Sequence, residues 1–121
     1  MKFLLLVHHS EENFSKFSEA TRRDMLAESV RLTHQLHENG QYVHASPLHP
    51  TPTTVLVRVR DGKSVVTDGP FAETREQLAG YFLVNAKDRD EAVAIASRIP
   101  GARIGTVEVR PVRDIEGLPG E

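Results

Sequence analysis

Cysteine and tryptophan are both absent from this chain of 121 residues. The absence of cysteine excludes disulfides, zinc–thiolate sites and thiol nucleophiles, and it makes the cytosol the expected compartment. A charge excess is also lacking, because 15 Lys and Arg stand against 17 Asp and Glu, a formal net charge of −2. A chain without a basic excess has no field that attracts nucleic-acid phosphates. We therefore expect no binding to DNA or RNA.

Long apolar runs are absent as well. The first run, residues 3–7, ends at His8 and His9. It is far shorter than the roughly 20 residues that cross a bilayer, and no small-residue cleavage site follows it. We expect a buried strand there and no membrane association. The chain length fits one domain.

Hydrophobic periodicity predicts two helices and six strands. One helix is expected over residues 18–39 and another from Asp88, where Glu91 stands at capping-box spacing. The first helix carries one apolar arc, which consists of Met25, Leu26, Val30, Leu32 and Leu36. The stripe expected to be buried on the second consists of Ala92, Ile95, Ala96 and Ile99. Strands are expected over residues 3–7, 41–45, 54–60, 64–67, 81–84 and 104–110.

The order of these elements indicates an α+β fold. Apart from a hairpin turned by Asp61 and Gly62, the order is β-α-β-β-α-β, which is typical of ferredoxin-like domains. The strands at 3–7 and 81–84 are apolar on both faces, but two helices cover only one face of a sheet. A second copy of the sheet would cover the other face. We therefore expect a homodimeric α+β barrel with a cavity between its sheets, formed by residues 1–112, and a tail over residues 113–121.

Several segments together resemble one family. Residues 67–74 read TDGPFAET, residues 76–81 read EQLAGY, and residues 107–111 read VEVRP. This pattern is similar to that of the DGPF branch of the YCII-related proteins, and the resemblance extends from Met1 to about Val112. It implies a dimeric α+β barrel and no cofactor. It also implies a cytosolic homodimer that binds a small molecule or regulates a partner, with a sigma factor as the expected partner.

The resemblance also implies an alternative function. Some relatives are small lyases or dehalogenases that use a proposed His-Asp pair, so a cofactor-independent lyase, isomerase or dehalogenase is the second hypothesis. The family's histidine lies early in the first helix, where residues 22–28 of this chain read RRDMLAE. His34 and His37 lie nearer the end of that helix. The pair is therefore not carried over to this sequence.

Three residues are candidates for acid–base catalysis. Asp68 ends a strand beside the expected cavity, where it would act as a general base or accept N–H groups of its own Asp-Gly-Pro turn. We favour the turn. His8 and His9 end the first strand, where one ring should lie on each face of the sheet and one of them should face the cavity.

Four residues are candidates for ligand binding, each with a structural alternative. Phe71 would line the cavity or anchor its loop in the core, and anchoring is favoured. Glu73 and Gln77 would bind a polar ligand or lie in a solvated loop, and Arg58 would attract an anion or pair on the surface. The solvated alternatives are favoured for these three.

No metal site is predicted. His34 and His37 are one turn apart, a spacing that two ligands of one metal can have. No His-Glu-x-x-His motif accompanies them. Because His37 falls within the apolar arc, we expect it to be partly buried and hydrogen-bonded.

Overall fold

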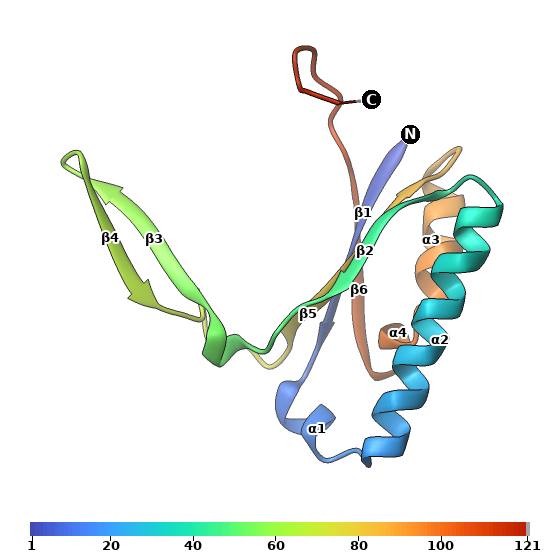
Figure 1. Cartoon of the computed structure of the whole chain (residues 1–121), viewed down its shortest axis with the longest axis horizontal. Coiled ribbons are helices and arrows are strands. Elements are labelled where there is room, and N and C mark those ends of the chain that lie inside the picture. Colours follow the sequence, from blue (N-terminus) through green and yellow to red (C-terminus); the bar gives the residue numbers. More distant parts are fainter. Residues whose placement is uncertain (121) are drawn as a thin grey trace.

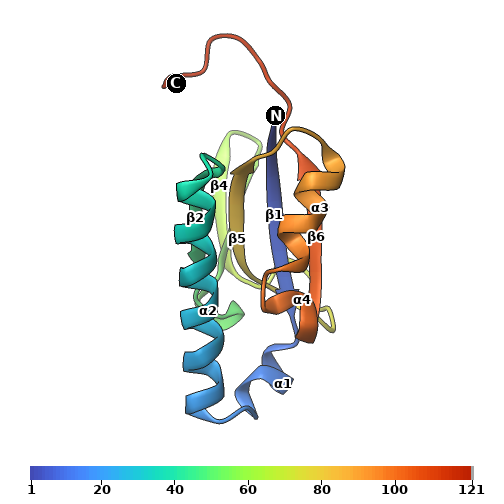
Figure 2. The same cartoon turned by 90° about the vertical axis from the view of Figure 1, so that its right-hand side faces the viewer.

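The computed structural model describes residues 1–120, in which a four-stranded sheet carries all its longer helices on one face (Figures 1 and 2). The sheet consists of β1 (Lys2–His9), β2 (Tyr42–Pro47), β5 (Gln77–Asn85) and β6 (Gly105–Pro111). Its order is β2-β5-β1-β6, and every neighbouring pair is antiparallel. The α+β ferredoxin-like prediction is therefore confirmed, with β1 and β5 in the centre as expected.

The remaining elements are four helices, one short 3-10 turn and a separate hairpin. They are α1 (Glu11–Ser15), α2 (Glu19–Glu38), α3 (Arg89–Ser97), α4 (Gly101–Ile104), η1 (Thr51–Thr53), β3 (Val55–Arg60) and β4 (Lys63–Asp68). The sequence patterns predicted α2, α3 and the hairpin but neither α1 nor α4. No helix among residues 1–120 is both long and apolar enough to cross a membrane. Residues 112–120 contain neither helix nor strand.

Capping side chains explain where the two main helices begin. The main-chain N–H of Thr21 donates to Ser18 Oγ (3.0 Å) at the start of α2. At the start of α3, the N–H of Glu91 donates to Asp88 Oδ1 (2.9 Å), while Glu91 Oε1 accepts the N–H of Lys87 (3.0 Å). The bonds of Thr21 and Glu91 satisfy main-chain donors that the first helical turn leaves free, and the bond of Lys87 ties the segment before α3 to that turn.

The core lies between the sheet and the helices. Phe3, Leu5 and Val7 alternate along β1 toward the helices and are buried. They pack with residues of the other elements, namely Leu32, Leu36, Phe82, Val84, Ala86, Ala92, Ile95, Ala96 and Ile99. The predicted stripe of α3 is thus buried as expected.

The apolar side chains of helix α2 are fully buried only from Leu32 onward. Leu32 and Leu36 are buried, whereas Leu26 is 52% exposed and Val30 is 48% exposed. The apolar arc identified in the sequence is therefore fully buried only at Leu32 and Leu36. The reason is that α2 has 20 residues and α3 only nine, so the beginning of α2 has no comparable helix beside it.

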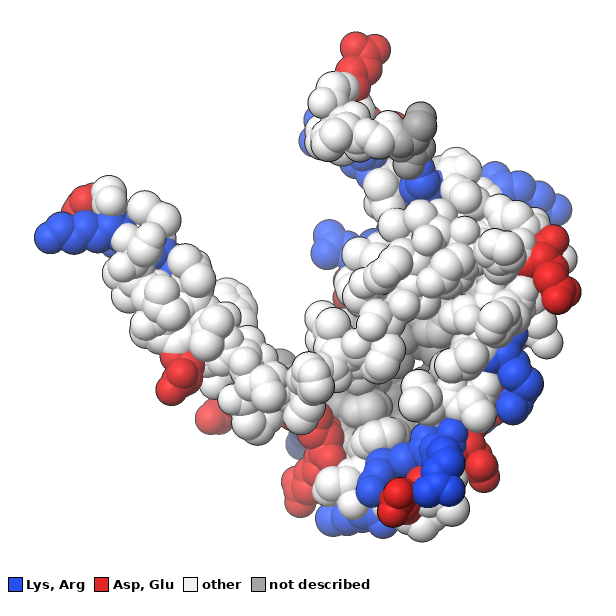
Figure 3. Space-filling view, in the orientation of Figure 1, with Lys and Arg blue, Asp and Glu red and all other residues white. Residues whose placement is uncertain are grey.

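Strands β3 and β4 form an arm that projects from the sheet on the side opposite the helices (Figure 1). Asp61 and Gly62 both have positive φ, 51° and 74°, as the favoured two-residue hairpin turn requires. The side chains of Val55, Val57, Val59 and Val66 alternate onto one face of the arm, and each is more than half exposed. Figure 3 shows the middle of the arm as uncharged, with charged side chains near its tip and base.

The sheet face opposite the helices is here called the open face, because no helix covers it (Figure 1). Its centre holds Leu4, Leu6 and Leu83, which are intermediate in burial. At the β2 side, Tyr81 Oη and His44 Nδ1 are hydrogen-bonded at 2.8 Å. The open face is therefore apolar at its centre and polar toward its edges.

Candidate functional site

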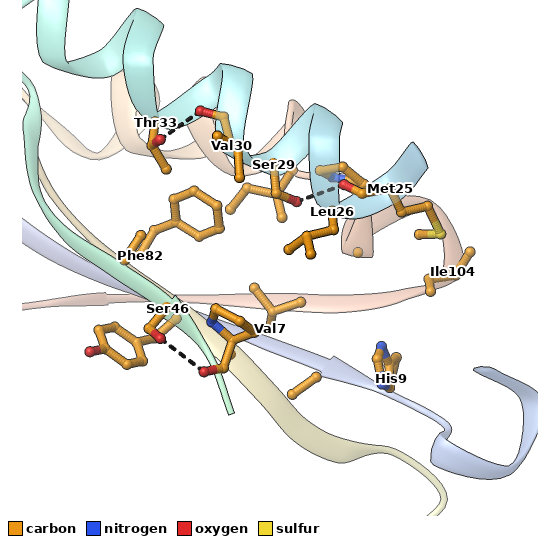
Figure 4. A pocket seen from close by; sticks show the side chains of 18 of the residues that line it. Val7, His9, Met25, Leu26, Ser29, Val30, Thr33, Ser46, Phe82 and Ile104 are labelled. Atoms are coloured by element: carbon orange, nitrogen blue, oxygen red, sulfur yellow. Dashed lines mark hydrogen bonds between the residues drawn. The ribbon is translucent and has the colours of Figure 1, made fainter. Parts of the chain in front are cut away.

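A pocket lies between α2, from Arg22 to Thr33, and the sheet (Figure 4). Its volume is about 290 Å³, which is near the lower end for small-molecule sites. Leu26 and Val30 reach into it from α2, and Val7 and Phe82 reach into it from the sheet (Figure 4). The pocket occupies the space that the poorly packed half of α2 leaves open.

Small residues help to leave this space unfilled. Ala45, Gly80 and Gly101 all line the pocket. At Gly101 an added Cβ would lie 2.4 Å from Val7 Cγ1, so a larger residue would collide with the pocket wall. The cavity therefore follows from specific small residues as well as from helix length.

The hydroxyl groups of the wall already have acceptors. Ser29 Oγ donates to the Met25 carbonyl (3.1 Å), and Thr33 Oγ1 donates to the Val30 carbonyl (2.6 Å). Both hydroxyl protons are therefore donated to carbonyls of α2 itself. The middle of the pocket therefore presents mainly apolar groups to a ligand.

His9 lies at the end of the pocket nearest α1. Its ring stacks on Phe14, with 4.4 Å between centroids and 15° between planes. Burial lowers the pKa of His9 below 6.5, although Glu11 and Glu76 act in the opposite direction. A neutral imidazole can accept a proton, so His9 is the pocket group best suited to acid–base chemistry.

Arg22 lies in the pocket lining, where main-chain carbonyls hold it. Its Nη1 donates to the carbonyls of Phe17 (2.6 Å) and Ser15 (3.2 Å). The position of the guanidinium is thereby fixed by the segment that joins α1 to α2. Arg22 supplies a positive charge to an otherwise uncharged wall.

His8 and His9 lie on opposite faces of the sheet, as expected from their adjacent positions. His8 Nε2 is 3.3 Å from Glu108 Oε1 of β6, a residue of the open face, whereas His9 lines the pocket. The pocket lies on the helix side of the sheet rather than between two sheets. The catalytic role of either histidine stays a prediction.

Asp68 lies outside this pocket. It is exposed at the end of β4, paired with Val55, and its carboxylate accepts no hydrogen bond from residues 1–120. Its turn is held instead by the Gly69 N–H, which donates to the Thr54 carbonyl (2.8 Å). The favoured account, in which Asp68 accepts N–H groups of its turn, therefore has no hydrogen bond in this structure to support it.

The four expected ligand-binding residues also lie outside the pocket lining. Phe71 is 73% exposed, so the expectation that it anchors its loop in the core is wrong for the single chain. Glu73 and Arg58 are exposed, on the loop and on the arm respectively. Gln77 accepts the Glu11 N–H (2.9 Å) and donates to the Thr74 carbonyl (2.6 Å), which joins α1 to the loop before β5.

The histidines of α2 do not form a cluster of potential metal ligands. His34 is exposed, and no group of three or more His, Asp or Glu suited to a metal occurs among residues 1–120. His37 is exposed and meets Tyr42 edge-on, with 6.4 Å between ring centroids. The expectation that His37 is partly buried is wrong, because α2 turns this position toward solvent beside the edge strand β2.

Comparison with known proteins identifies a family but no reaction. The family model of the YCII-related domain matches residues 1–116. The chain is also 31% identical, over 114 residues, to an uncharacterised protein of Rhizobium meliloti (strain 1021), an alignment that covers 93% of this chain and 92% of that protein.

Proposed function

The chain belongs to the YCII-related family, and from this membership and the pocket we propose that the protein is a homodimer that binds a small, largely apolar molecule between α2 and the sheet. The observation that carries the proposal is the exposure of Leu26 and Val30 on the wall of an apolar pocket. Apolar side chains left facing a preformed pocket are the usual setting of a ligand site. Association with a sigma factor stays a prediction of the family resemblance.

Binding can be tested with a neutral probe. Titration of the wild-type protein with indole, followed by amide chemical shifts, should perturb residues of α2, β1 and β5 around the pocket. Ser29→Phe should fill the pocket and abolish these shifts, because Ser29 lies on its wall. Ser97→Phe is the matched control, since Ser97 is an exposed residue of α3 that does not line the pocket.

Equal responses of the two variants would contradict the proposal. The proposal would also be contradicted if the amide chemical shifts of wild-type protein did not change saturably at millimolar indole. Thermal melts of both variants should precede the titration, so that loss of binding is read only from folded protein.

Two apolar surfaces support the dimer. The open face exposes a centre of leucines, and the arm exposes four valines on one face. An isolated two-stranded hairpin is marginally stable in water. A two-fold partner that packs its sheet against the open face and contacts the arm would cover both surfaces.

Light scattering tests the dimer directly. Wild-type protein should have twice the mass of the chain at micromolar concentration. Leu83→Glu should favour the monomer, because it would place a charge at the centre of the open face. Val93→Glu is the control, as Val93 is an exposed residue of α3 on the other side of the sheet. A monomeric wild-type protein with native spectra would remove the barrel.

A small cofactor-independent enzyme is the second candidate, and the lowered pKa of His9 in the pocket is the observation that favours it. Acceleration of phenylpyruvate tautomerisation would reveal proton transfer by the pocket. His9→Gln should then lower the rate by about two orders of magnitude, as loss of a general base does, whereas His8→Gln should not. If wild-type protein gives only the buffer rate, the isomerase form of this candidate fails.

A further inference from the structure

Arg22 is the only Lys, Arg, Asp or Glu among the residues that line the pocket. It is intermediate in burial, and no carboxylate of residues 1–120 forms an ion pair with it. Its neighbour Arg23 pairs instead with Glu19, at 3.1 Å. A guanidinium without a carboxylate partner, on a pocket wall that carries no other charge, is the group of this pocket suited to bind an anion.

The hydrogen bonds of Arg22 leave one edge of the guanidinium available. Nη1 is bonded to the Ser15 and Phe17 carbonyls, whereas Nε and Nη2 have no acceptor within residues 1–120. The N–H groups of Nε and Nη2 point in parallel from one side of the planar group. This is the fork that binds both oxygens of a carboxylate.

The rest of the lining limits what else the ligand can carry. Burial lowers the pKa of His9 and so favours its neutral form. The hydroxyls of Ser29 and Thr33 are used within α2, and the other wall groups are mainly apolar. No acidic side chain among the described residues lines the pocket to repel an anion. The volume of about 290 Å³ limits the ligand to a small body.

From this arrangement, and resting on the proposed function, we infer that the pocket binds a small aromatic or branched-chain monocarboxylate, with its carboxylate on the Nε and Nη2 edge of Arg22 and its apolar body against α2 and β5. The two carbonyls fix the guanidinium before the ligand arrives. Less side-chain entropy is therefore lost when the carboxylate binds.

Matched acids and amides test the charge separately from the apolar body. Benzoate, phenylacetate and 3-phenylpropanoate are each titrated into the protein, and so is the primary amide of each acid. Calorimetry gives the affinity of every compound. Wild-type protein should bind at least one of the acids about tenfold to a hundredfold more tightly than its amide, the range expected of a charge-assisted bidentate contact. Arg22→Gln should remove this preference, so that each acid binds no more tightly than its amide. Arg23→Gln, at the adjacent exposed cation, should retain it.

The outcomes separate this inference from the proposed function. If every acid and its amide bind equally to wild-type protein, the pocket binds ligands but the role of Arg22 is refuted. If none of the six compounds binds at millimolar concentration although indole does, the inferred ligand class is refuted and the proposed pocket stands; if indole does not bind either, both fail. Should Arg22→Gln not fold, Arg22→Lys keeps the charge without the fork, and a preference undiminished in that variant would refute bidentate binding.

Discussion

A pair of leucine truncations on α2 would test the origin of the pocket. Leu36 has 0% exposure in the core, whereas Leu26 is 52% exposed on the pocket wall. Leu36→Ala should cost about 2–5 kcal/mol, because it removes buried apolar area and leaves a cavity. Leu26→Ala should cost about 1 kcal/mol, since about half of its area is already exposed and no new enclosed cavity forms. The expected difference between the two variants is about 1–4 kcal/mol, a large enough part of a total stability of roughly 5–15 kcal/mol to be resolved.

Urea unfolding is the appropriate assay, and both variants should shift the midpoint while the slope stays the same. Both positions are within α2 and both changes are Leu to Ala, so helix propensity cancels between them. Each curve should be recorded at two protein concentrations, because dimerisation would add to apparent stability. Equal costs for the two variants would show that the first half of α2 is packed in solution, and the pocket would then not exist as described.

Three further predictions follow from individual residues. The free energy of unfolding should fall as pH falls below 6.5, because the lowered pKa of His9 favours the neutral imidazole in the folded state. His9→Gln should flatten this part of the pH dependence, which chemical denaturation at a series of pH values measures. Asp68→Asn and Asp68→Ala should each change the free energy of unfolding by less than about 0.5 kcal/mol, because the Asp68 side chain is exposed and accepts no hydrogen bond from residues 1–120. A loss above about 1 kcal/mol for Asp68→Ala alone would show that Asp68 accepts N–H groups of its turn. Gly105→Ala should lower the melting temperature sharply, since the new Cβ would lie 2.0 Å from the His8 carbonyl oxygen, and an unchanged melt would show that β6 can move away from β1.

The fold could be predicted because local signals agreed with each other. The apolar runs of β1 and β5, the caps Ser18 and Asp88, and the Asp61-Gly62 turn each identify an element and its type. Helix α1 was missed because five residues give no helical period. Its sequence signals are the cap Ser10, whose Oγ accepts the Asn13 N–H (3.1 Å), and the acidic Glu11 and Glu12 of its first turn.

The pocket could not be predicted in the same way. An amphipathic arc shows which side chains avoid water, but not whether another element is there to cover them. Met25, Leu26 and Val30 therefore belong to the same apolar arc in the sequence as the buried Leu32 and Leu36, and nothing in the sequence analysis assigned a role to Arg22. The small residues Gly80 and Gly101, which line the same pocket, were the available signal of unfilled space.

Strand β1 separates the proposed ligand pocket from the proposed dimer interface. Ligand binding and dimerisation can therefore be tested one at a time. Because its side chains alternate, Val7 and His9 belong to the pocket while Leu6 and His8 belong to the open face. Substitutions on opposite faces share no side-chain partner and should act additively unless β1 itself moves. Loss of ligand binding in the dimer variant Leu83→Glu would therefore mean that the pocket takes its shape from the assembled pair of sheets rather than from the single chain.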